Sequence, residues 1–142
     1  MPIDFIFFSL IFVGLNILLD FISVKFHDLP GIDFLFFAPW YAGVIYSPGK
    51  ALMLGMIILV IHASMRLKIA HFILVSFPGP ILAAYLGNIL GYGGFWLSLL
   101  VYYAVSSIIV LAMRGLGAKY VTFMAINLIM NVTLFFLVPF VI

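Results

Sequence analysis

Residues 34–66 read FLFFAPWYAGVIYSPGKALMLGMIILVIHASMR, and this apolar stretch decides how the chain is expected to fold. It has about 33 residues, whereas one helical crossing of a bilayer takes about 20. Pro48 and Gly49 interrupt it near the middle, and Lys50 adds a charge at the interruption. The pattern predicts two short apolar helices joined by a tight turn, a hairpin around which the rest of the chain packs in lipid.

The composition of the whole chain indicates a membrane protein. Of the 142 residues, 68% are hydrophobic and 7% are charged, and the mean hydropathy is +1.41. A soluble domain is about 45–50% apolar and about 25% charged, so this chain lacks the polar side chains that a water-exposed surface needs. We expect one integral membrane domain over residues 1–142, embedded in the lipid bilayer.

Six apolar segments follow one another, and every connection between them contains glycine, proline or a charged residue. The apolar runs are continuous rather than alternating, which favours helices over strands in lipid. We therefore predict an all-α polytopic transmembrane bundle of about six helices. Pro78 and Pro80 are expected to kink or interrupt the fourth helix, because each lacks a backbone donor. The predicted ranges are 3–24, 34–47, 51–66, 69–90, 94–113 and 119–141.

The basic residues predict an orientation. On the six-helix count, Lys50 falls alone on one side of the membrane. The positive-inside rule then places the opposite side in the cytoplasm and both termini outside the cell membrane. The five basic residues on the cytoplasmic side are Lys25, Arg66, Lys68, Arg114 and Lys119.

Small residues recur every fourth position in the fourth segment, at Ala83, Gly87 and Gly91. Such a face lets helix backbones approach closely in lipid. Residues 38–42 and 51–55 repeat this spacing in the central hairpin. Packing within the chain is favoured over contact with a partner, and both stay open.

Polar residues near the middle of the last segment predict either helix–helix hydrogen bonds or a ligand site. Asn127 and Asn131 are four residues apart and share a helix face, and buried amides need partners. Tyrosines, serines and a further asparagine in the two preceding helices would complete a pocket of the usual small-molecule type. The candidate ligand-binding residues are Tyr85, Asn88, Tyr102, Tyr103, Ser106, Asn127 and Asn131.

Polar residues near the helix ends are expected to reach water. Asn16 and Asp20 share a face of the first helix, and Asp20 lies about one turn from its end, beside Lys25. Solvation at the membrane interface is the favoured explanation for Asp20 and His62. His27 and Asp28 together with Asp33 could make a small hydrophilic site in the first loop, but a solvated loop is favoured.

Several chemistries are disfavoured. The chain has no cysteine, which excludes disulfides and thiolate metal sites, and its histidines and aspartates form no metal-ligand spacing. Lysine and arginine are not clustered, so no nucleic-acid partner is expected. No catalytic set is predicted, an enzyme is less expected than a non-enzyme, and no cofactor can be named.

The stretch 29–55 carries a resemblance. Its pattern consists of Pro39, Gly43, the turn 48–50 and Gly55. It resembles the substrate-binding S-components of energy-coupling-factor vitamin transporters and the MreD-like rod-shape membrane proteins, which share a six-helix arrangement. The resemblance implies a membrane subunit that works with other integral membrane subunits.

Three functions remain open from the sequence. The leading hypothesis is a small-molecule-binding subunit of a membrane transporter, which lacks an ATPase motif and so needs partner subunits for energy. The second is a non-catalytic structural subunit of a larger membrane complex. The third is an intramembrane enzyme acting on lipid or isoprenoid.

Overall fold

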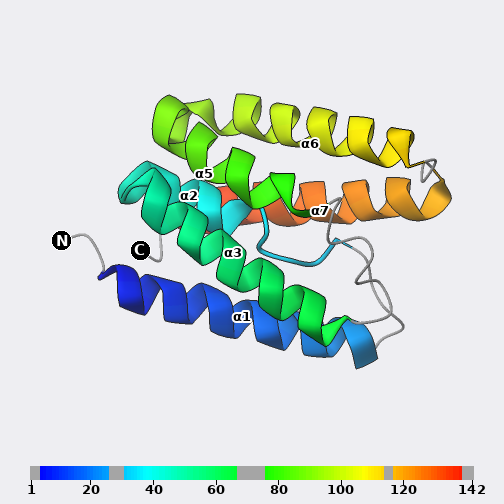
Figure 1. Cartoon of the computed structure of the whole chain (residues 1–142), viewed down its shortest axis with the longest axis horizontal. Helices are drawn as coiled ribbons and strands as arrows, with labels where there is room; N and C mark the ends of the chain where they lie inside the picture. The colour runs from blue at the N-terminus through cyan, green and yellow to red at the C-terminus, as the bar shows by residue number, and fades with distance from the viewer. Residues whose placement is uncertain (1–3, 26–30, 67–75, 114–116, 139–142) are drawn as a thin grey trace.

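The computed structural model describes residues 4–25, 31–66, 76–113 and 117–138, and these ranges contain helices and no strand. The predicted all-α fold is confirmed. The predicted residues 69–75, together with Lys68 and Arg114, lie outside the described ranges. The helices are α1 (Phe5–Lys25), α2 (Phe37–Ile45), α3 (Pro48–Met65), α5 (Pro78–Leu90), α6 (Phe95–Ala112) and α7 (Ala118–Leu137), with a short 3-10 helix, η2 (Tyr92–Gly94), before α6 (Figure 1).

Four of the described helices are long and apolar enough to cross a membrane: α1, α3, α6 together with η2, and α7. Their outer faces carry large exposed apolar side chains, such as Ile6 and Leu10 on α1 and Ile129 on α7. Such side chains are costly in water and suit contact with lipid tails. The described helices therefore fit a membrane protein.

The second predicted segment is not a membrane-spanning helix, which corrects the expectation of a helix over 34–47. The helix α2 has only 9 residues, a length of about 14 Å at 1.5 Å per residue, against a hydrocarbon core of about 30 Å. Residues 31–36 precede it in non-helical conformation and are mostly buried. We call residues 31–36 the buried linker. Its backbone bonds to side chains of α1 and α7, which is why the helix starts late.

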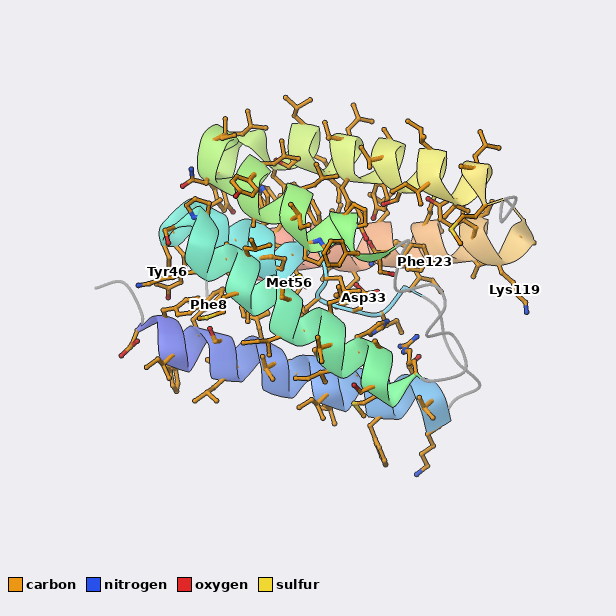
Figure 2. All side chains as sticks on the ribbon, in the orientation of Figure 1. Phe8, Asp33, Tyr46, Met56, Lys119 and Phe123 are labelled. Carbon is orange, nitrogen blue, oxygen red and sulfur yellow. The ribbon has the colours of Figure 1, made fainter. Side chains whose placement is uncertain are left out.

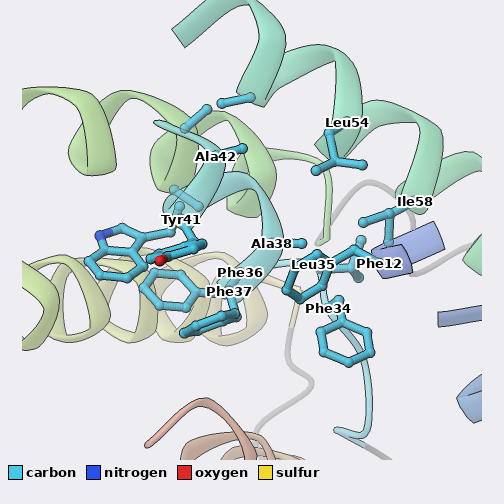
Figure 3. Packing of buried hydrophobic residues seen from close by; sticks show 14 of the residues in the cluster. Phe12, Phe34, Leu35, Phe36, Phe37, Ala38, Tyr41, Ala42, Leu54 and Ile58 are labelled. Atoms are coloured by element: carbon cyan, nitrogen blue, oxygen red, sulfur yellow. The ribbon is translucent and has the colours of Figure 1, made fainter. Parts of the chain in front are cut away.

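The helix α2 occupies the centre of the bundle and packs chiefly against α5 and α3 (Figure 1). All its residues from Phe37 to Gly43 are buried. Its aromatic side chains spread outward into the core, where Phe37 stacks on Tyr41 (Figure 3). Phe36, which directly precedes the helix, contacts Tyr102 of α6. The apolar stretch that decides the fold therefore forms the core of the bundle.

Small residues allow α2 and α5 to touch backbone to backbone. A Cβ atom added at Gly87 would meet the carbonyl oxygen of Trp40, and one added at Gly43 would meet that of Ala84. Ala83 lies on the same buried face of α5. At Ala83 and Gly87 the predicted small-residue face is thus covered within the same chain, whereas Gly91 has open space around it.

The ends of α5 have local causes. Phe77 lies in a turn and α5 begins at Pro78, where a missing donor costs a helix nothing. The predicted interruption by proline is therefore confirmed. Gly91 ends the helix with a φ of +62°, a conformation that glycine adopts without strain, and open space surrounds it.

Candidate functional site

Side chains from distant helices satisfy the backbone of the buried linker. The Phe34 N–H donates to Oδ1 of Asn16 at 3.1 Å, and the Gly31 carbonyl accepts from Nδ2 of Asn127 at 3.1 Å. Non-helical backbone is tolerated at membrane depth only where protein groups bond to it. Asn16 on α1 and Asn127 on α7 therefore hold the linker between them.

A charge cluster lies between α1 and α3. Asp20 has no exposed surface, accepts from Nδ2 of Asn16 at 2.8 Å, and accepts from Nε of Arg66 at 3.0 Å. Nδ1 of His62 lies 2.8 Å from Oδ1 of the same aspartate. We define the charge cluster as Asp20, His62 and Arg66.

The expectation that Asp20 reaches the interface beside Lys25 was wrong. Arg66 follows α3 and reaches back to Asp20, and removing one partner of such a buried pair is expensive. The sequence contained a signal for this pair, because the predicted number of membrane crossings places the ends of α1 and α3 on the same side of the membrane. Because the two helix ends lie on the same side, the basic residue Arg66 was available as a partner for Asp20.

Asp33 is the one described residue of the possible first-loop site, because His27 and Asp28 lie outside the described residues. It was expected in a solvated loop, but it is 2% exposed and lies in the interior of the molecule (Figure 2). Its Oδ1 accepts from the N–H of Leu35 at 3.1 Å, and no basic side chain of the described residues lies within ion-pair distance. Asp33 lies between α1 and α2, outside the four candidate spanning helices. Burial raises the pKa of its carboxyl above the ordinary value, and His62 opposes that shift.

The two amides of α7 share a face as predicted but differ in their bonding. Oδ1 of Asn127 accepts from the Tyr103 hydroxyl at 3.0 Å and from Nδ2 of Asn131 at 2.8 Å. Nδ2 of Asn127 also donates to the Gly31 carbonyl, so both ends of the Asn127 amide are engaged within the chain. Asn131, by contrast, has a buried Oδ1 without a partner in the described residues.

The remaining predicted residues divide into two groups. Tyr102 is buried on α6 and bonds to Ser106 one turn on, beside the Tyr103–Asn127 contact. Tyr85 is 49% exposed, and Asn88 is also exposed on α5. The structure therefore brings the α6 and α7 residues together and leaves the two α5 residues outside.

Three buried polar atoms at the junction of α2, α6 and α7 have no hydrogen-bond partner in the described part of the chain: Nε1 of Trp40, Oγ of Ser98 and Oδ1 of Asn131. Along the antiparallel helices α6 and α7, Ser98 and Asn131 lie between two contacts. One is the hydrogen bond of Tyr103 to Asn127, and the other is the ring contact of Phe95 with Phe135 at 4.1 Å.

The indole of Trp40 lies 5.0 Å from the ring of Phe95, so it borders the same junction. Buried polar atoms are nearly always paired. A donor, a hydroxyl and an acceptor left unpaired in one region are therefore a binding-site signal. We call these three side chains, Trp40, Ser98 and Asn131, the unpaired triad.

Among the residues that the structure describes, no group of three or more histidine, aspartate or glutamate side chains could hold a metal ion. Protein-family models, curated proteins and solved structures were compared with this chain, and none matches.

Proposed function

We propose that the chain is the small-molecule-binding membrane subunit of a transporter and that partner subunits supply the energy. The observation that carries the proposal is the unpaired triad. A ligand with both hydrogen-bond donors and acceptors would satisfy these three atoms, and the surrounding rings of Phe36, Phe95 and Tyr102 offer apolar contact. The need for partner subunits rests on the absence of an ATPase motif from the sequence.

The proposed orientation in the cell membrane has both termini outside. Lys25 ends α1, Arg66 follows α3 and Lys119 begins α7, and these helix ends lie at one end of the bundle (Figures 1 and 2). Lys50 begins α3 at the opposite end. This asymmetry supports a cytoplasmic location for the end that carries Lys119.

A structural subunit anchored through small residues is the competing function. Its main sequence argument was the face formed by Ala83, Gly87 and Gly91, which would receive a partner helix; Gly91 has open space around it. The backbone of Trp40 already occupies the face at Gly87, so it leaves no room for a partner there. This occupation favours the transporter subunit over the structural one.

The test is a search for bound small molecules in purified protein. Wild type, Ser98→Ala and the control Leu100→Ala are purified into lipid nanodiscs, denatured, and analysed by mass spectrometry for released compounds. Leu100 is exposed on the outer face of α6, so its truncation leaves the unpaired triad intact. We expect a compound that wild type and the control retain.

Ser98→Ala should lower the retained amount by roughly tenfold, because a ligand group left unpaired costs about 1–3 kcal/mol. The ligand-free Ser98→Ala protein should be no less stable than wild type, since the variant removes an unpaired hydroxyl. If wild type releases nothing beyond empty nanodiscs, and other integral subunits co-purify with it stoichiometrically, the structural-subunit function replaces this one.

A further inference from the structure

We propose that Asp33 is a proton-binding site of this membrane protein, which holds an exchangeable proton between the charge cluster and the unpaired triad. The proposal goes beyond ligand binding. It concerns the ligand-free chain, so its test and the ligand search can fail independently.

The first argument is the pairing of Asp33 itself. The side chain is 2% exposed and receives one hydrogen bond, from the N–H of Leu35 two residues on. Within the described ranges, no lysine, arginine or histidine nitrogen comes close enough to form an ion pair with it. An isolated carboxylate is very costly in such surroundings, and it becomes neutral by taking up a proton.

The second argument is the charge that surrounds Asp33. On the side of α1 and α3, its electrostatic neighbours are Asp20, His62 and Arg66. Arg66 pairs with Asp20 through the 3.0 Å contact, so that carboxylate already balances its charge, and its longer-range effect on Asp33 opposes burial without reversing it. Because Asp20 and Arg66 balance each other, a proton on Asp33 leaves these three side chains with no net charge, and His62 is the remaining member of the charge cluster that acts on Asp33.

The third argument is position. On the side of α6, the carboxyl of Asp33 lies within electrostatic range of Tyr102 and Tyr103, and Tyr103 bonds to Asn127. Loss of the proton would therefore place a negative charge between the charge cluster and the tyrosines that border the unpaired triad.

The experiment is infrared spectroscopy on the protein in lipid nanodiscs at neutral pH. A protonated carboxyl has a carbonyl stretch that a carboxylate lacks, and labelling with 13C-aspartate shifts it. Wild type should show this band with the label shift, and Asp33→Asn should lose it. The control Asp4→Asn removes an exposed carboxyl and should leave the band unchanged.

A second measurement follows unfolding against pH. Above the ordinary aspartate value of about 3.9, the unfolded chain releases its proton while folded Asp33 keeps one. The folded state then binds more protons, so stability falls as pH rises, until Asp33 titrates in the folded chain. One such proton lowers the folding equilibrium constant by about tenfold per pH unit in this window. Asp33→Asn should remove that dependence and be at least as stable as wild type at neutral pH.

Each other outcome overturns the proposal. Absence of a label-sensitive protonated band from wild type does so even if Asp33→Asn fails to fold. A band that persists in Asp33→Asn assigns the proton to another group. If sodium chloride stabilises wild type more than choline chloride does, and no protonated band is present, Asp33 holds a metal cation instead.

Discussion

The substitution Gly87→Ala tests the closest helix contact in the fold. The added methyl group would meet the carbonyl oxygen of Trp40 and come within 2.9 Å of its carbonyl carbon. Both are backbone atoms of α2, so rotating a side chain cannot relieve the clash, and α2 must separate from α5. Forcing extra volume into a packed interior costs about 1–3 kcal/mol.

Gly14→Ala is the matched control, because Gly14 also lies inside a helix and a Cβ there meets nothing within 4 Å. Replacing glycine by alanine in a helix contributes about 1 kcal/mol in favour of both variants. The difference between them therefore isolates the steric cost, expected at about 1–3 kcal/mol. The assay is equilibrium unfolding in detergent micelles. Equal stability of the two variants would refute the contact between α2 and α5.

Three further substitutions probe other parts of the account. Asn127→Leu strands the linker carbonyl that the amide holds and should cost about 1–3 kcal/mol of unfolding free energy; a loss near 0.6 kcal/mol, typical of interhelical bonds in membranes, would mean that the carbonyl has another partner. Arg66→Leu leaves the buried Asp20 without its arginine partner and should cost about 3–5 kcal/mol; when Asp20→Leu is already present, the loss caused by Arg66→Leu should be smaller, and an equal loss would contradict the pairing. Single cysteines at Gly93 and Lys119 should label from opposite sides of the membrane, position 93 from outside; labelling of position 93 only from the cytoplasm would reverse the proposed orientation.

The parts of the fold that local sequence controls were predictable. Continuous apolar runs gave the helices, and Pro78 gave the start of α5. The length of α2 was not predictable from residues 34–47. The backbone before the helix bonds to the side chains of Asn16 and Asn127 instead of continuing the helix. The amide of Asn127 lies 96 residues from the Gly31 carbonyl that it binds, and no local pattern encodes that pairing.

The candidate site shows the same division. Asn127 and Asn131 were found because polar residues deep in an apolar helix must point inward, yet their separate roles depend on contacts to other helices. The selection of Tyr85 conflicted with the predicted small-residue face. Tyr85 lies two residues from both Ala83 and Gly87, about 200° around the helix, so packing that face inward turns the tyrosine outward. The burial of Asp33 was not predicted, because a charged residue between two helices is usually solvated.

Hydrogen exchange of the buried linker in lipid nanodiscs tests the central claim, that non-helical backbone lies inside the bundle and is held there by side chains. The Phe34 amide should exchange as slowly as the amides of α2, although it belongs to no helix. Asn16→Ala should accelerate exchange at Phe34 and leave α6 unchanged, because the lost bond is local. Exchange at Phe34 as fast as at the exposed Gly93 in wild type would contradict the account.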